Sequence, residues 1–284
     1  MAVGDTGVDA ALLEGAGTVF NLVESPPGRP TFQVEAAAAF ERSGLKVTGS
    51  SAEAIRATTD KEATRQTLTR HGVAVAPGGL LDPGHPEVLD RVMPPWILKP
   101  SQEDASLGLD ATAVTSDRAE AVARALELGN LFDGQPVLVE HLLPGREFNL
   151  SVLESASGPE VLPAAEMTFV DFPSDRPRIL DWEAKWDEGS FAYQNTVRVF
   201  LNGTETALRG HLEDVARVSW SACGLTGYGR VDIRLDEDAI PRVLEINANP
   251  CISPDAGFAA AAARAGIKPH EVVRRILTAA GWKE

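Results

Sequence analysis

The sequence predicts an α/β protein made of short strands and amphipathic helices. Near the N-terminus, Thr18 to Val23 has the pattern of a short buried strand, and Phe32 to Ser43 that of a helix ended by Gly44. A strand at 46–48 and a second helix follow, and this alternation is typical of an open parallel sheet. Between Gly227 and Asp255, two runs of alternating apolar and polar residues flank a polar turn, which predicts an antiparallel strand pair.

The remaining elements follow from apolar periodicity and from capping residues. We expect a short helical piece over 8–14, and helices that begin at residues 52 and 60 behind capping Ser and Asp or Thr side chains. The other expected helices cover 117–128, 204–222, an Ala-rich run after 255, and 271–280. The other expected strands cover 94–100, 111–115, 136–140, 146–152, parts of 160–170, and 242–247.

Composition limits the classes of function. A chain of 284 residues with 44% hydrophobic residues can bury a core and form one to three domains. The net charge of 26 − 41 = −15 argues against a nucleic-acid partner, although a few Lys and Arg side chains can still bind a small anion. Two cysteines, Cys223 and Cys251, do not support a disulfide framework. Without an apolar run of about 18 residues or a signal-like N-terminus, we expect a cytoplasmic protein with no membrane partner.

The predicted strand pair carries a candidate metal site. Asp232 lies on the first strand, and Glu245 and Asn247 lie two apart on the second, so the last two share a face. Three oxygen ligands of this kind suit Mg²⁺, with Mn²⁺ as an alternative. Arg230 shares a face with Asp232 and could contact a phosphoryl group. A surface hairpin with solvated charges is the other reading, but the acids lie within apolar runs, where burying an unpaired carboxylate is costly.

Two lysines are candidate phosphate ligands. Lys61 lies in the first turn of its helix, where a cation is unfavourable unless an anion joins it. Lys99 ends a predicted strand and precedes a loop of small residues, 101–108, whose backbone could close over phosphate. A solvated surface lysine remains the alternative for Lys61.

The segment G-R-V-D … L-E-I-N-A-N-P resembles the metal-binding segment of the ATP-grasp ligases, most closely the D-alanine–D-alanine ligase branch. The resemblance extends over about residues 18–280, with the family's functional residues in the same order. It implies phosphate contacts for Lys61, Lys99 and Lys185, adenine contacts from Glu140 and the hinge at Leu142 and Leu143, and a ribose contact from Glu147. For Glu140 and Glu147 a plain β-hairpin is the alternative, and for Lys185 a local surface ion pair.

The resemblance also implies an architecture and an activity. It divides the chain into a partial N-terminal α/β domain (1–59) and two ATP-grasp subdomains (60–147 and 148–284) that hold ATP between them. The implied reaction is ATP-dependent joining of a small-molecule carboxylate to an amine through an acyl phosphate, with Mg²⁺ on Asp232, Glu245 and Asn247. Lys99, Lys185 and Arg230 would offset charge on the transferred phosphoryl group. The sequence does not decide whether the protein forms a homodimer.

The chain departs from the family where the amino-acid substrates bind. The first strand-turn-helix unit with its acidic residue has no match, and Glu24-Ser25 replaces His-Gly. Ala105 replaces a serine, Trp186 replaces a tyrosine, and the family's small hydroxyl residue falls near Ala256. These changes predict poor activity with D-alanine. They leave open a ligase for another acid and amine, such as a natural-product pair, or a nucleotide-binding remnant without ligase activity.

Overall fold

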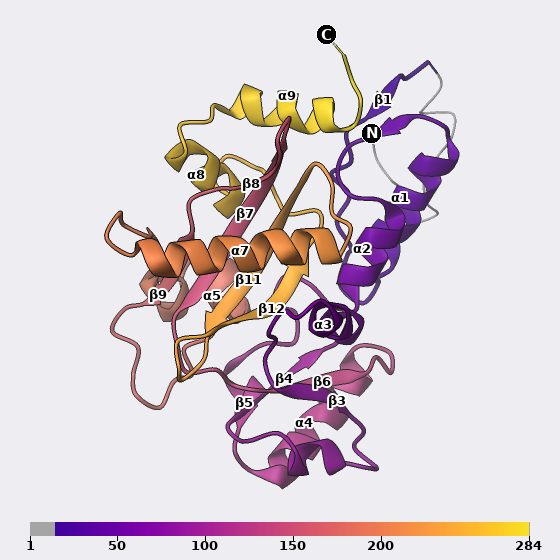
Figure 1. Ribbon diagram of the computed structural model, residues 1–284. Helices are drawn as coiled ribbons and strands as arrows, with labels where there is room; N and C mark the ends of the chain where they lie inside the picture. Colours follow the sequence, from indigo (N-terminus) through magenta and orange to yellow (C-terminus); the bar gives the residue numbers. More distant parts are fainter. Residues whose placement is uncertain (1–14, 284) are drawn as a thin grey trace.

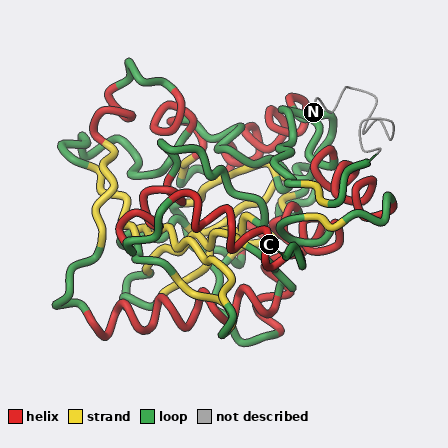
Figure 2. The backbone as a smooth tube through the Cα atoms, turned by 90° about the horizontal axis from the view of Figure 1, so that it is seen from above, coloured by secondary structure: helices red, strands yellow, loops and turns green. Residues whose placement is uncertain are grey.

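The computed structural model describes residues 15–283, in which helices surround three β-sheets (Figures 1 and 2). The smallest sheet pairs β1 (Thr18–Val19) with β2 (Lys46–Val47) in parallel, and α1 (Phe32–Arg42) connects them. The expected parallel alternation is therefore present, although the first strand is shorter than its apolar run. The helical piece expected over residues 8–14 lies outside the described residues. Two helices then lead to the next sheet, α2 (Ala52–Thr59) and α3 (Lys61–Arg70).

The second sheet has four antiparallel strands in the order β3-β6-β4-β5. Its strands are β3 (Gly78–Leu81), β4 (Trp96–Pro100), β5 (Val114–Thr115) and β6 (Val137–His141). Helix α4 (Arg118–Leu131) covers one face, where Leu98, Leu128 and Val139 belong to one buried cluster. The strand expected over 111–115 is mostly wrong, because Ala111–Ala113 forms a 3₁₀ turn that Asp110 caps through Thr112. Short 3₁₀ turns of this kind commonly serve as connectors.

The third and largest sheet follows the order β10-β9-β7-β11-β12, with β8 paired to β7. Its neighbouring strands are antiparallel, so the expected pairing of the two C-terminal strands is confirmed. The strands are β7 (Glu147–Ser155), β8 (Gly158–Val161), β9 (Ala165–Phe169), β10 (Thr196–Phe200), β11 (Tyr228–Leu235) and β12 (Pro241–Asn247).

Alternation along β11 gives this sheet two different faces. Val231, Ile233 and Leu235 are buried in the largest core cluster, together with side chains of α7 (Thr206–Ala222), which crosses that face in Figure 1. Asp232 and Arg234, one residue out of phase, point to the opposite face. The period of two therefore separates the core from a polar face.

Two C-terminal helices cover one end of the polar face. They are α8 (Gly257–Arg264) and α9 (Pro269–Ala279), and they bury Phe258 and Val272 against Leu153 and Tyr228 of the sheet. The Tyr228 and Phe258 rings meet edge to face, with centroids 5.8 Å apart. Two five-residue helices, α5 (Trp182–Trp186) and α6 (Phe191–Asn195), connect β9 to β10. Within residues 15–283, no helix has the length and apolar character needed to cross a membrane.

A β-bulge changes the direction of one side chain in β12. Asp232 is paired with Glu245 and Ile233 with Val243, so Leu244 is an extra residue opposite β11. Val243 points into the core, whereas Leu244 and Glu245 both line the polar face. Alternation counted back from Glu245 would have directed Leu244 to the core and Val243 to the polar face; the bulge reverses this, so an apolar side chain joins the polar face.

Candidate active site

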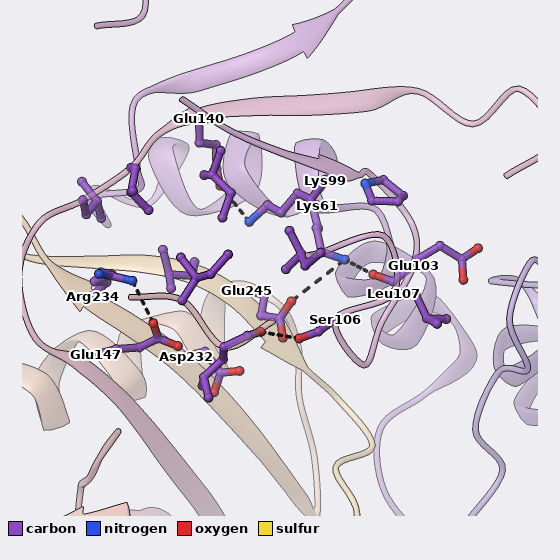
Figure 3. A pocket seen from close by; sticks show the side chains of 18 of the residues that line it. Lys61, Lys99, Glu103, Ser106, Leu107, Glu140, Glu147, Asp232, Arg234 and Glu245 are labelled. Atoms are coloured by element: carbon purple, nitrogen blue, oxygen red, sulfur yellow. Dashed lines mark hydrogen bonds and ion pairs between the residues drawn. The ribbon is translucent and has the colours of Figure 1, made fainter. Parts of the chain in front are cut away.

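A cleft with about 780 Å³ of space, including its mouth, lies between the four-stranded and six-stranded sheets (Figure 3). Residues of β4 and β6 line one side, and residues of β11 and β12 line the other. All seven residues predicted to contact nucleotide line this cleft: Lys61, Lys99, Glu140, Leu142, Leu143, Glu147 and Lys185. The tertiary structure therefore brings together side chains that are up to 124 positions apart in sequence, from 61 to 185.

Glu140 is the most deeply buried acid of the cleft, with 1% of its side chain exposed. One carboxylate oxygen accepts from Lys99 Nζ at 2.7 Å and the other from Arg65 Nη1 at 2.6 Å. Arg65 also donates to the backbone carbonyl groups of Ala76 and Gly78. The carboxylate is thus neutralised by two cations and fixes the position of Lys99.

Arg65 was not predicted from the sequence, although a signal for it was present. It lies four residues after Lys61 on α3, so both side chains share one helix face. The shared face is the one that points into the cleft and toward β6.

The hinge, residues 141–146, connects β6 of the four-stranded sheet to β7 of the six-stranded sheet. The Leu142 N–H donates to the Pro95 carbonyl at 2.8 Å, and His141 Nδ1 lies 2.7 Å from the Met93 carbonyl. These bonds anchor the segment to the loop before β4. Because the Leu142 N–H already has a partner, the backbone at Leu143 is the better candidate for contact with a base.

Glu147 begins β7 and is held by a residue that sequence reasoning missed. Arg234 Nη1 donates to Glu147 Oε2 at 3.1 Å, and Arg234 Nε donates to the Gly145 carbonyl. Burial raises the pKa of Glu147, and the nearby Arg234 charge opposes that rise. Arg234 lies two residues after Asp232 on β11, so alternation could have placed it on the same face.

The predicted metal residues are brought together on β11 and β12. Asp232 is directly opposite Glu245, and Arg230 is directly opposite Asn247. Arg230 donates two hydrogen bonds to Asp232, at 2.7 and 2.8 Å, and Asn149 donates a third at 2.8 Å. Arg230 and Asn247 are not among the residues that line the cleft itself; they extend the cluster beyond it.

The second carboxylate of this cluster, Glu245, lies among cations. Its oxygens are 4.0 Å from Lys61 Nζ and 3.8 Å from Arg230 Nη2. Burial alone would raise the pKa of Glu245, but the charges of Lys61, Lys185 and Arg230 lower it to about 2. Glu245 is therefore an anionic oxygen donor at neutral pH.

These side chains fit the oxygen-ligand chemistry of Mg²⁺. The donors are two carboxylates and the carboxamide of Asn247, whose Oδ1 also accepts from the Asn249 N–H at 2.9 Å. In the part of the chain that the structure describes, no group of three His, Cys, Asp or Glu side chains is arranged to hold a metal ion. A metal here would complete its ligand shell from water or phosphate oxygens.

Lys61 and Lys185 enter the cleft from different sides. Lys61 is only 5% exposed, donates to the Glu103 carbonyl, and lies 3.9 Å from Asp104, so it is not a solvated surface lysine. Lys185 lies on α5, which Asp181 begins by accepting from the Ala184 N–H. Lys185 lines the cleft from this helix.

Two loops that frame the cleft are joined to each other. Trp186 Nε1 donates to the Ala105 carbonyl at 2.9 Å, and Ser106 Oγ donates to the Leu180 carbonyl at 2.6 Å. The Trp182 N–H donates to the Leu109 carbonyl at 3.0 Å. Two of the residues that differ from the family pattern, Ala105 and Trp186, thus contact each other, and Ser106 lines the cleft.

Known proteins resemble this chain along most of its length. Residues 82–278 match the family model for the D-ala D-ala ligase C-terminus. An uncharacterized protein, y4sG, of Sinorhizobium fredii is 30% identical over 95% of this chain and 76% of its own length. A D-alanine–D-alanine ligase of Chromohalobacter salexigens is 32% identical over 84% of this chain and 70% of its own.

Solved structures show the same fold at lower identity. A D-alanine–D-alanine ligase from Bacillus anthracis, complexed with ATP, superposes with a TM-score of 0.74 at 16% identity. The match covers 96% of this chain and 83% of that one. The enzyme from Coxiella burnetii gives a TM-score of 0.71 over 93% of this chain and 68% of its own. The chain therefore has the ATP-grasp fold and belongs to the D-alanine–D-alanine ligase family.

Proposed function

We propose that this protein is an ATP-dependent carboxylate–amine ligase that activates a carboxylate as an acyl phosphate. One observation carries the proposal: the seven predicted nucleotide residues line a single cleft that also contains Asp232 and Glu245. A hairpin of solvated charges, or a local ion pair for Lys185, would not require this convergence. The relatives named as D-alanine–D-alanine ligases support the same reaction class.

ATP would lie along the cleft, with its base at the hinge. We assign the apolar side of the base to Ile97 and Leu244, and the polar edge to the backbone at Leu143. The ribose hydroxyl groups would donate to Glu147. Because Arg65 and Lys99 occupy the Glu140 carboxylate, we assign Glu140 the role of holding Lys99 rather than of binding the base through its side chain.

The phosphate groups would lie among the lysines at the other end. Lys61, Lys99 and Lys185 line that part of the cleft and supply positive charge. Mg²⁺, held by Asp232, Glu245 and Asn247, would supply further charge to the phosphate oxygens. Arg230 is bound to Asp232 in this structure and lies beside the same region, so it could contact the transferred phosphoryl group.

The order of bond changes follows from this placement. A substrate carboxylate oxygen attacks the terminal phosphorus, and ADP leaves. The amine nitrogen then attacks the acyl carbon, loses a proton, and displaces inorganic phosphate. The loops joined through Trp186 and Ser106 would cover an acyl phosphate and slow its hydrolysis. We further propose the division 1–59, 60–147 and 148–284, with ATP between the last two parts.

An isotope experiment tests this function. The protein, ATP, Mg²⁺ and a pool of amino acids labelled with ¹⁸O in the carboxylate are incubated, and the phosphate is analysed by mass spectrometry. Phosphate that carries one ¹⁸O, together with ADP and a new amide, is the expected result. Formation of AMP, or release of unlabelled phosphate without amide, would contradict the ligase assignment.

A further inference from the structure

A buried asparagine, Asn249, lies two residues after Asn247 in the bend that follows β12 (residues 247–250, here called the metal bend). Its backbone N–H donates to Asn247 Oδ1 at 2.9 Å, which orients that carboxamide and leaves Oδ1 a second lone pair for a cation. Asn249 is 7% exposed and is not among the residues that line the nucleotide cleft. Its side chain can therefore act on the metal site only through the bend to which it belongs.

The nitrogen of the Asn249 carboxamide contacts the N-terminal part of the chain. Asn249 Nδ2 donates to the Val23 carbonyl at 2.8 Å, across 226 positions. The Val23 N–H donates to Asn21 Oδ1 at 3.1 Å, and the Asn21 N–H donates to Thr48 Oγ1 at 2.9 Å, directly after β2. The segment 20–25 is thus bonded to the two-stranded sheet on one side and to the metal bend on the other.

The oxygen of the same carboxamide contacts Tyr228, the first residue of β11. The Tyr228 hydroxyl donates to Asn249 Oδ1 at 2.5 Å and lies 3.3 Å from the Asn21 carbonyl oxygen. Tyr228 is fully buried, and its ring packs edge to face on Phe258 of α8. Both polar atoms of the Asn249 side chain therefore have partners that other contacts hold in place, so the carboxamide has one orientation.

The chain beyond this segment reaches the phosphate side of the cleft. The Gly28 N–H donates to Glu103 Oε2 at 3.3 Å, and the Glu103 backbone carbonyl accepts from Lys61 Nζ. Gln33 Nε2, on α1, donates to Asp104 Oδ2 at 3.0 Å. The N-terminal part of the chain therefore contacts both the metal bend and the loop that holds Lys61.

Attachment of the N-terminal part does not depend on Asn249, because a separate contact precedes β11. The Thr226 N–H donates to Ser50 Oγ at 3.2 Å, and Thr226 Oγ1 donates to the Gly49 carbonyl at 2.8 Å. A Cβ on Gly227 would lie only 3.2 Å from Gly49 Cα, so the two backbones touch. Filling space beside this contact would be served by an apolar side chain, whereas burying a carboxamide is costly unless its hydrogen bonds are made.

We propose that Asn249 is a positioning residue that holds the metal bend and the segment 20–25 in one arrangement, with the Tyr228 hydroxyl as its support. This inference rests on the proposed metal site at the end of β12. Because one carboxamide bonds both parts, order gained at either is passed to the other, and the coupling is reciprocal. A cation bound at Asn247 would thus order the segment that ends in Glu24, the replacement for the family's substrate-side histidine, before the acid substrate binds.

The first measurement is Mn²⁺ binding in the presence of ADP, followed by electron paramagnetic resonance of the free ion. Asn249→Ala should weaken Mn²⁺ binding about tenfold or more, the usual effect of losing a residue that orients a metal ligand. Tyr228→Phe, which removes only the hydroxyl, should weaken it less. The matched controls are Asn202→Ala in the exposed loop before α7 and Tyr193→Phe on α6, and both should bind Mn²⁺ like the wild type. ADP binding in EDTA should be equal in all these proteins.

Hydrogen exchange followed by mass spectrometry gives a readout that a merely structural residue would not change. In the wild type, adding Mn²⁺ to the ADP complex should slow deuterium uptake in peptides that cover residues 20–25. In Asn249→Ala, uptake in these peptides should be faster and should no longer respond to Mn²⁺. Peptides of α4, which is remote from the metal bend in Figure 1, should exchange equally in both proteins.

The outcomes separate this inference from the proposed function. If Glu245→Gln binds Mn²⁺ as tightly as the wild type, the proposed metal site is wrong and the inference falls with it. If Glu245→Gln loses Mn²⁺ while Asn249→Ala and Tyr228→Phe keep wild-type affinity, the metal site stands and the role of Asn249 is overturned. A segment 20–25 that still responds to Mn²⁺ in Asn249→Ala overturns it equally. Should Asn249→Ala fail to fold, Tyr228→Phe decides by the same two measurements.

Discussion

Glu147 and Arg234 face each other across β7 and β11, with Oε2 3.1 Å from Nη1 and each side chain 7% exposed. The contact uses one carboxylate oxygen and fixes its plane. Burial raises the pKa of Glu147, so without Arg234 the carboxylate would be costly to keep ionised. The pair therefore holds the Glu147 carboxylate as a charged, oriented hydrogen-bond acceptor in the cleft, next to the hinge.

This arrangement predicts a nucleotide-specific effect of Glu147→Ala. Loss of charged hydrogen bonds to the ribose should weaken ATP binding by about 1–3 kcal/mol. Binding of 2′-deoxy-ATP should change much less, because that nucleotide has already lost one hydroxyl partner. Calorimetric titration of both nucleotides checks this, and an equal loss for both would remove Glu147 from the ribose site.

The proposed metal site predicts that Glu245→Gln reduces the Mg²⁺-dependent reaction rather than nucleotide selectivity. The substitution removes one of the two carboxylates of the proposed ligand set and keeps the side-chain volume. We expect Mg²⁺-dependent ADP formation to fall by at least about 100-fold, a loss of roughly 3 kcal/mol of transition-state stabilisation. ADP formation is measured over a range of Mg²⁺ concentrations. Glu237→Gln in the exposed β11–β12 turn is the matched control and should behave like the wild type.

Gly145 lies too close to the backbone of Leu235 for a larger side chain. A Cβ at this position would lie 2.5 Å from the Leu235 carbonyl oxygen, which is backbone and cannot rotate away. Gly145→Ala should therefore destabilise the fold by about 1–3 kcal/mol and weaken ATP binding as Glu147 shifts. Chemical denaturation and nucleotide titration measure the two effects.

Gly210 provides the opposite case for the same substitution. It lies within α7, and an added Cβ there meets no atom within 4 Å. Gly210→Ala should stabilise the protein by about 0.5–1 kcal/mol, because alanine loses less backbone entropy in a helix. If Gly145→Ala left stability unchanged or raised it, as Gly210→Ala is expected to do, the clash assigned to Gly145 would be wrong.

The substrate side predicts weak activity with D-alanine. Ala105 has no hydroxyl group, and the indole N–H of Trp186 donates to the Ala105 carbonyl. Neither residue therefore offers a substrate the hydroxyl group that the family's serine or tyrosine would provide. Sites that recognise substrates by hydrogen bonds lose orders of magnitude when partners are absent. Phosphate release with D-alanine alone is compared with a panel of other acids and amines. D-alanine as the best substrate of that panel, with efficient dipeptide synthesis, would contradict this prediction.

Local sequence pattern was enough for the parts of this protein that depend on neighbouring residues. The alternation in β11 and β12 correctly predicted an antiparallel pair that carries Asp232 on one strand and Glu245 and Asn247 on the other, because side-chain direction in a strand has a period of two. Local chemistry also predicted a cap by Asp60 or Thr59 at the start of α3, and Asp60 provides it. The order of family motifs then indicated which side chains belong to one site.

The partners of those side chains were decided by tertiary structure. Arg65 reaches Glu140 across 75 positions and Arg234 reaches Glu147 across 87, and no local pattern encodes contacts over such separations. Leu244 enters the cleft because a bulge interrupts the alternation of β12, and Asn249 reaches Val23 across 226 positions. A charged residue shows its chemistry in the sequence, but the charge that compensates it is set by how the sheets pack.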